Sequence, residues 1–119
     1  MGFRMRIFLL PVPEGNVIAR EEQFGRFEAE FFIGQNGQVL YRHPWDSRPW
    51  FVGSARSAFN EAAAAWNRYC DEVNPNYTEQ EQQLAVGRLR DALSQSGVMI
   101  THTDNVWQVL LEQAENGLL

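Results

Sequence analysis

Two histidines, each with an acidic residue close by in the chain, are the first candidates for chemistry. His43 is followed by Asp46, and His102 by Asp104. An imidazole beside a carboxylate can act as an acid–base pair or a metal site. No H-x-x-x-H or H-E-x-x-H spacing joins the two histidines, so we expect solvated loop residues. A small hydrolase that uses His43 and His102 stays open as an alternative.

The stretch FVGSARSAF, residues 51–59, joins an apolar segment to a helical pattern through Gly53 and Ser54. It lacks the G-x-S-x-G of a nucleophile elbow, and also the second glycine and the lysine of a phosphate loop. We expect Ser54 to be the N-cap of the helix. An anion site formed by Ser54 and Arg56 is the alternative, because the first N–H groups of a helix attract negative charge.

Cys70 and the pair Glu28 and Glu30 complete the candidates for catalysis. Cys70 is the only cysteine, which excludes an internal disulfide and a cysteine-built zinc site. It lies on an apolar stripe, so we expect a buried side chain that behaves as a small hydrophobe. The two glutamates share one face of a strand pattern, where such pairs favour solubility. We therefore predict no catalytic residue, no metal and no cofactor, and a protein that is not an enzyme.

Aromatic and arginine side chains gather in the segment 41–51. Trp, Tyr and Arg dominate binding hot spots because they bury much area and keep a polar group. The sequence therefore predicts a surface that binds a protein partner. The negative charges of Glu28 and Glu30 would attract a basic partner to it. Trp50 fits either this surface or the core. The predicted surface residues are Glu28, Glu30, Tyr41, Arg42, Trp45 and Arg48.

Composition narrows the functional classes. The 119 residues, 45% of them apolar, suit one domain over residues 1–119. All ten cationic side chains are arginine, and fifteen acidic residues bring the net charge to -5. This charge repels nucleic acid, and the lack of lysine excludes Schiff-base chemistry. The apolar run Ile7–Leu10 is too short for a signal peptide or a membrane helix, so we expect a cytoplasmic protein with no membrane partner.

The first half of the chain has the periodicity of strands. Ile7–Leu10 predicts a first strand, and the alternation in Phe27–Ile33 predicts a half-buried one. Residues 34–37, GQNG, predict a hairpin turn that leads to a returning strand at Val39–Arg42. After a loop, Trp50–Val52 is a further short strand. These segments predict an antiparallel sheet of about four to five strands.

The second half has helical spacing. Its first apolar stripe, which should face the sheet, consists of Phe59, Ala63, Trp66, Cys70 and Val73. The helix should stop before Pro75, because the residue preceding a proline is pushed out of the α region.

A second helix should begin at Thr78, the first residue of a capping box, and end at Gly97. It carries Leu84, Leu89 and Leu93. Residues 98–100 should be extended. Asp104 should cap a last helix at Asn105–Asn116, closed by Gly117 and Leu118.

The stretches FVGSARSAF and NVWQVLLEQAENGLL resemble motifs of the SUKH superfamily, in particular its fourth subfamily of bacterial immunity proteins. The first is similar to F-V-x-S-S-x-x-x-F, and the second to W-x-x-V-L-E-x-x-x-x-G-L-L. The resemblance covers roughly residues 27–119, with Ala55 in place of the second serine. It implies an α+β domain that neutralises a cognate toxin without catalysis or cofactor. The matching residues are Phe51, Val52, Ser54, Phe59, Trp107, Val109, Leu110, Glu112, Gly117, Leu118 and Leu119.

The sequence thus predicts a SUKH-like α+β domain, with C-terminal helices covering one face of the sheet. Its function would be to occlude a toxin domain, such as a nuclease or deaminase, through a sheet edge and the loop 41–50. Glu28 and Glu30 would supply charge complementarity. An exposed sheet edge could also pair two copies. A small-ligand or anion-binding module is the alternative from another class.

Overall fold

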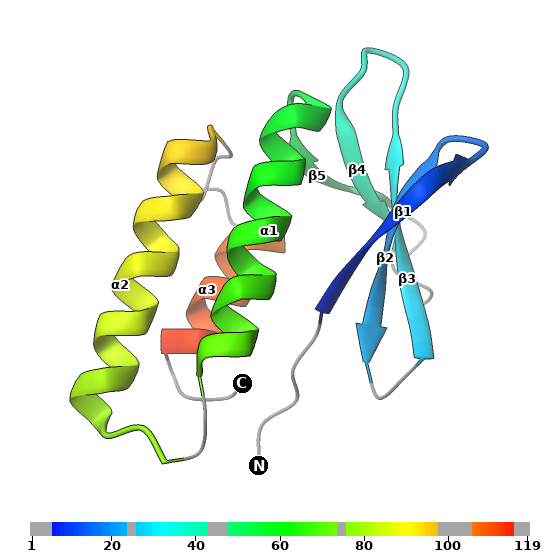
Figure 1. The fold of residues 1–119 in the computed structure, drawn as a ribbon. Coiled ribbons are helices and arrows are strands. Elements are labelled where there is room, and N and C mark those ends of the chain that lie inside the picture. The colour runs from blue at the N-terminus through cyan, green and yellow to red at the C-terminus, as the bar shows by residue number, and fades with distance from the viewer. Residues whose placement is uncertain (1–5, 24–25, 43–47, 74–75, 98–105, 116–119) are drawn as a thin grey trace.

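The computed structural model describes residues 6–23, 26–42, 48–73, 76–97 and 106–115, with the side chains of 23 and 26–28 left out. It contains one antiparallel sheet of five strands, followed by three helices (Figure 1). The predicted α+β class is therefore confirmed. The strands are β1 (Arg6–Glu14), β2 (Val17–Gln23), β3 (Arg26–Ile33), β4 (Val39–Arg42) and β5 (Trp50–Gly53), and each pairs with the next along the chain.

The hairpin between β3 and β4 lies where the GQNG turn was predicted. Gly37 has a φ of 76°, a left-handed conformation that glycine adopts without strain. The Gly34 N–H donates to the Gln38 carbonyl oxygen at 2.8 Å, and Ile33 pairs with Val39. Because the turn fixes this register, it also decides which side chains of the two strands share a face.

The strand β2 was not predicted. Its sequence, VIAREEQ, has consecutive polar residues at Arg20, Glu21 and Glu22 in place of a clear alternation. An irregularity in the pairing of Val17 and Ala19 with β3 shifts the register of the first residues. Tertiary pairing on both sides makes this segment a strand, since β1 and β3 supply its backbone partners.

The inner face of the sheet and the helices form the core. The helix α1 (Arg56–Glu72) lies between the sheet and α2 (Glu79–Ser96), and α3 (Val106–Glu115) packs against β5 and α2 (Figure 1). The predicted stripe is confirmed, because its four residues on α1 and Val73, the C-cap of that helix, are all buried. The Phe59 ring lies 5.0 Å from that of Phe31 in the sheet and 6.1 Å from that of Trp107 on α3, centroid to centroid.

The start of α1 corrects the prediction for Ser54. The N-cap is Ala55, which is extended and makes no side-chain capping bond, and Ser54 is exposed. The helix begins one residue later than predicted. Ser54 is one residue too early to be the cap, since the capping bond is made by the side chain of the N-cap residue itself.

The second helix follows its predicted signals at both ends. Thr78 and Glu81 form a capping box, and Gly97 is a left-handed C-cap with a φ of 89°. Leu89 and Leu93 are buried, whereas Leu84 is 57% exposed. Five residues turn a helix by about 140° beyond one full turn, so Leu84 points away from Leu89. The predicted segment 98–100 and the predicted caps of the last helix lie outside the described residues.

Candidate functional site

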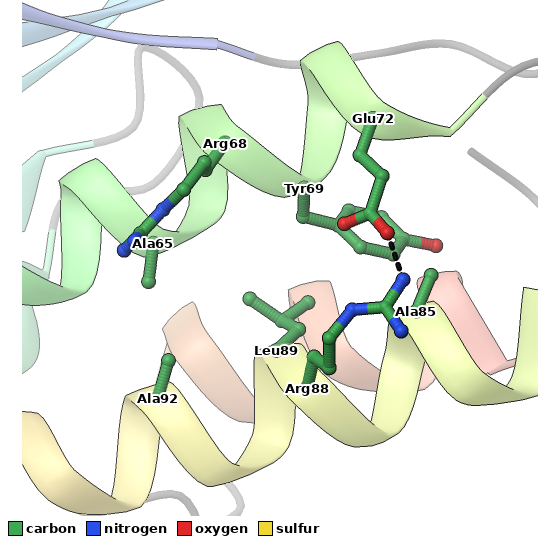
Figure 2. Close-up of a pocket in the computed structure, with 8 residues that line it drawn as sticks. All are labelled: Ala65, Arg68, Tyr69, Glu72, Ala85, Arg88, Leu89 and Ala92. Atoms are coloured by element: carbon green, nitrogen blue, oxygen red, sulfur yellow. Dashed lines mark hydrogen bonds and ion pairs between the residues drawn. The ribbon is translucent and has the colours of Figure 1, made fainter.

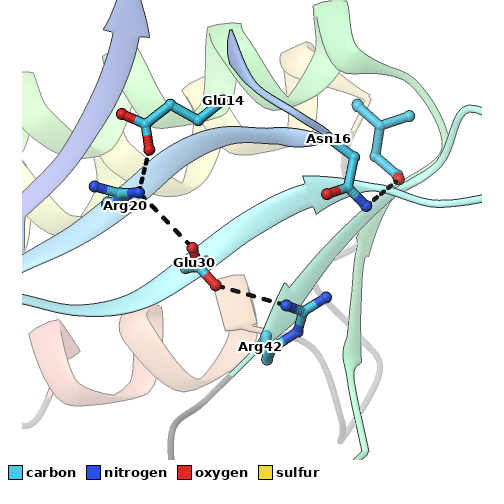
Figure 3. Close-up of polar contacts among 6 residues, drawn as sticks. Glu14, Asn16, Arg20, Glu30 and Arg42 are labelled. Atoms are coloured by element: carbon cyan, nitrogen blue, oxygen red, sulfur yellow. Dashed lines mark hydrogen bonds and ion pairs between the residues drawn. The ribbon is translucent and has the colours of Figure 1, made fainter.

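The outer face of the sheet, opposite the helices, carries two rows of side chains that run across the strands. The strand register aligns the first row in the order Phe8, Arg20, Glu30 and Arg42. It aligns the second row in the order Val17, Phe32, Leu40 and Phe51. We call these the charged row and the apolar row. In Figure 3 the helices lie behind the sheet, and the polar members of the charged row lie in front of it.

Ion pairs connect the charged row. Arg20 forms an ion pair with Glu14 and lies 3.9 Å from one carboxylate oxygen of Glu30. The other carboxylate oxygen of Glu30 lies 3.6 Å from Arg42 Nη1 (Figure 3). The Glu30 side chain is 34% exposed and that of Arg42 is 52% exposed. Two guanidinium groups thus flank Glu30, and the four ion-paired side chains carry no net charge together. The role of Glu30 as negative charge for a basic partner stays a prediction.

The apolar row is buried at its β2 and β3 end and open at β5. Phe32 and Val17 are buried, although they lie outside the main core cluster. The Arg42 guanidinium lies 4.3 Å from the centroid of the Phe32 ring, which is a cation–π contact. Phe51 is 36% exposed, and Phe8 at the β1 end of the charged row is 42% exposed. The outer face therefore has an aromatic side chain at each edge and an arginine near its centre.

The structure brings only part of the predicted partner surface together. Glu30 and Arg42 face each other across β3 and β4. Arg48 is exposed just before β5. The Glu28 side chain and Trp45 lie outside the described residues. Phe8, Leu40 and Phe51 were missed, although the period-two alternation of the predicted strand Val39–Arg42 already implied that Leu40 shares a face with Arg42.

Tyr41 does not belong to this surface, which corrects a further prediction. It points to the inner face, is 4% exposed, and its hydroxyl donates a hydrogen bond to the buried Glu21 carboxylate. Burial and then the hydrogen bond to Glu21 raise the pKa of Tyr41 above its ordinary value. The phenol is therefore protonated at neutral pH. Its role is to satisfy a buried carboxylate rather than to meet a partner.

A groove between α1 and α2 contains two cavities, of about 150 and 250 Å³, which share Ala65, Arg68 and Ala92. Figure 2 shows the residues that line the smaller one. Arg88 is ion-paired with Glu72 at its rim. Arg68 makes no ion pair with any described residue. Each cavity is smaller than the roughly 300 Å³ of a typical ligand pocket. The groove is best explained by small side chains where two helices meet.

Most of the residues considered for catalysis lie outside the part of the chain that the structure describes. His43, Asp46, His102 and Asp104 lie outside the described residues. Cys70 is buried, as predicted. Within the described ranges no group of three or more His, Cys, Asp or Glu side chains could hold a metal ion.

The predicted anion site is not assembled into a pocket by any observed contact. Ser54 and Arg56 are both exposed at the start of α1, and no contact between them is seen. The anion site remains a prediction.

Among the described helices, none is long and apolar enough to cross a membrane.

Both edge strands of the sheet are bound by helix side chains. On β1, the Asn67 side chain of α1 forms two hydrogen bonds with the backbone of Ile7. On β5, the Trp107 indole N–H donates to the Val52 carbonyl oxygen at 3.2 Å. These contacts occupy backbone groups that an added strand would need. They favour the outer face over the predicted sheet edge as the docking surface.

No protein-family model, curated protein or solved structure matches the chain. The resemblance to the SUKH superfamily therefore remains a prediction based on two motifs. Of the motif residues, Val52, Phe59 and Trp107 are buried in the core. These positions contribute to the fold, and any specificity for a partner must come from other residues.

Proposed function

We propose that this protein is a non-catalytic binding domain of the immunity type, which neutralises a toxin domain by covering its active surface. The proposal includes a bacterial cytoplasmic setting and a nuclease or deaminase as the toxin. One observation supports binding above all: the outer face of the sheet is left uncovered by the helices and combines the half-exposed Phe8 and Phe51 with Arg42. Aromatic and arginine side chains provide most of the energy at protein interfaces.

Docking on this face would use each row differently. A partner would bury Phe8 and Phe51 and remove their apolar surface from water, which supplies most of the free energy of association. The charged row would orient the partner. The ion-paired side chains Glu14, Arg20, Glu30 and Arg42 carry no net charge together, and the more exposed member of the Glu30–Arg42 pair is the Arg42 guanidinium. An acidic group on the toxin would match it.

Co-expression tests the proposal. The protein is produced together with the product of the gene directly upstream of its own, and growth and co-purification are measured. We expect rescue of growth and a stable complex. Phe51→Ser should weaken the complex by about tenfold or more, as expected for a buried aromatic anchor.

Leu84→Ser is the matched control, because Leu84 is an exposed apolar residue on α2, away from the sheet. It should leave affinity unchanged. The proposal is wrong if the wild-type pair forms no complex and shows no rescue. If a complex forms but only Leu84→Ser weakens it, binding is real and the assignment of the face is wrong.

A further inference from the structure

Arg42 is held on the outer face without using its hydrogen-bond donors. Its Cζ atom lies 4.3 Å from the centroid of the Phe32 ring, in a cation–π contact that depends on the charge of the guanidinium group. Its Nη1 atom lies 3.6 Å from a Glu30 oxygen, which is longer than the roughly 2.7–3.2 Å of an N–H···O hydrogen bond. Arg42 donates no hydrogen bond to any described residue. Its N–H groups are therefore available to a partner.

Two other arginines of the chain use their donors internally. Arg88 donates a hydrogen bond to Glu72, and Arg90 donates one to Glu115. Each of these pairs joins two helices. The side chains of Arg42, Arg88 and Arg90 are similarly exposed, at 52%, 59% and 48%. Exposure therefore does not explain why the donors of Arg42 stay unused.

The strand register fixes the position of Arg42. In the β3–β4 hairpin Glu30 lies opposite Arg42, and Phe32 lies opposite Leu40, so Phe32 is the diagonal neighbour of Arg42. Diagonal neighbours lie about 7–8 Å apart, which a long side chain can span. The Phe32 ring is buried and forms a fixed support. A partner that binds this pre-positioned guanidinium group loses less side-chain entropy than with a mobile arginine.

Glu30 does not depend on Arg42 alone. Arg20 lies 3.9 Å from its other carboxylate oxygen, so Glu30 keeps a cation nearby when the donors of Arg42 meet a second acceptor. Figure 3 shows one terminal nitrogen of Arg42 on the side of Glu30 and the other directed away from it. The second nitrogen can therefore bind an acceptor without displacing Glu30.

A carboxylate of a protein matches this position. A planar carboxylate accepts two parallel hydrogen bonds from a guanidinium group, which is the strongest pairing available to arginine. A phosphate group carries more negative charge, and the nearby Glu30 would repel it more strongly. Beside Arg42, Leu40 and Phe51 pair across β4 and β5 and are both partly exposed. A protein segment can supply both the carboxylate and an apolar side chain for this pair.

We propose that Arg42 is the carboxylate-binding anchor of the outer face, and that the partner presents an aspartate or glutamate next to an apolar side chain. The carboxylate accepts hydrogen bonds from Arg42, and the apolar side chain packs on Leu40 and Phe51. Phe32 and Glu30 are positioning residues, because they act through Arg42. This inference rests on the proposed function, since it names the chemistry of the partner on the same face.

A peptide titration tests the anchor without a toxin. The probe is the blocked dipeptide acetyl-Leu-Asp-amide, and acetyl-Leu-Asn-amide is its neutral counterpart. The arginine Nε–H signals of the isotope-labelled protein are followed by NMR spectroscopy, and Arg42→Lys identifies the signal of Arg42. We expect the Asp probe to shift this signal saturably and the Asn probe to shift it far less.

Arg68 is the internal control of the titration, because it is exposed and makes no ion pair with a described residue. Its signal should barely respond. An Arg42 signal that shifts no more than that of Arg68, or equally with both probes, would overturn the proposal. Phe32→Leu keeps a buried apolar side chain without the ring and should reduce the response of Arg42. An unchanged response would overturn the pre-positioning on which the proposal depends.

The complex with the toxin gives a second test. Arg42→Lys keeps the charge but loses the two-donor geometry, so it should weaken the complex by about tenfold. Arg68→Lys should leave affinity unchanged. A complex that tolerates Arg42→Lys would overturn this inference and leave the proposed function standing. If the wild-type pair forms no complex, the proposed function is wrong, and the peptide titration decides whether Arg42 binds carboxylates.

Discussion

Glu21 and Glu30 are carboxylates on neighbouring strands of one sheet, yet the two faces stabilise them in different ways. Glu21 is buried on the inner face and accepts a hydrogen bond from the neutral Tyr41 hydroxyl. Glu30 is on the outer face, partly in water, between two guanidinium groups. A buried acceptor without a partner costs far more than an exposed one. Substitutions on the inner face should therefore change stability, and those on the outer face should change binding.

The largest expected contrast is between two phenylalanines on opposite faces. Phe31→Ala should lower the free energy of unfolding by about 3–5 kcal/mol, because it leaves a cavity among aromatic rings. Phe31 is fully buried, with ring centroids of Tyr41 and Phe59 at 5.1 and 5.0 Å. Phe51→Ala should cost less than about 1 kcal/mol, since that ring is already partly in water. Urea denaturation of both variants measures the difference, and equal losses would contradict the assignment of the faces.

The buried carboxylate provides the next test. Tyr41→Phe should destabilise the protein by about 1–3 kcal/mol, because the Glu21 carboxylate loses the hydroxyl that it accepts from. Tyr77→Phe is the matched control, since Tyr77 is partly buried beside the core and makes no hydrogen bond seen among the described residues. It should cost almost nothing. A negligible effect of Tyr41→Phe in thermal unfolding would mean that the Tyr41 hydroxyl contributes little to holding Glu21.

The same pair gives a pH dependence with a defined sign. Folding raises the pKa of Tyr41 above its ordinary value, mainly through burial. The unfolded chain then binds fewer protons than the folded one at alkaline pH, so stability falls as pH rises above about 10. Below that pH the contribution is fully present. Denaturation between neutral and alkaline pH should show this fall in the wild type and a shallower one in Tyr41→Phe; identical slopes would contradict it.

Substitution of Glu30, the carboxylate on the outer face, should have the smallest effect on the free energy of unfolding. Glu30→Gln removes two ion pairs at 3.6 and 3.9 Å, which are partly exposed and together should contribute below about 1 kcal/mol. The loss should shrink further at high salt. Glu61→Gln, at an exposed glutamate of α1 with no ion pair to a described residue, is the control. A loss as large as that of Tyr41→Phe would show that the two faces do not differ as we describe.

Local patterns predicted several elements correctly. The GQNG turn, the strand Val39–Arg42 and the capping box at Thr78 are present where the sequence placed them. Each depends on groups within a few residues of one another: a left-handed glycine, an alternation of period two, and a side chain that reaches its own helix start. Such signals need no distant partner, so one sequence is enough to read them.

The candidate site was predicted less well, since its composition depends on which face the helices cover. Arg42 and Tyr41 are adjacent in the sequence, and both residue types favour binding surfaces. Only the packing of α1 places Tyr41 in the core and leaves Arg42 exposed. The strand β2 was missed for a related reason, because its polar run becomes a strand through pairing with both neighbours.

By itself the sequence determined the α+β class, the GQNG hairpin turn and the buried stripe of α1, since all of these follow from local backbone preference and hydrophobic period. Tertiary structure alone decided that Glu30 lies between Arg20 and Arg42, that Glu21 accepts a hydrogen bond from Tyr41, and that Asn67 binds the backbone of Ile7. The physical reason is chain separation: Ile7 and Asn67 are 60 residues apart, and no local rule relates groups that only packing brings within hydrogen-bonding distance.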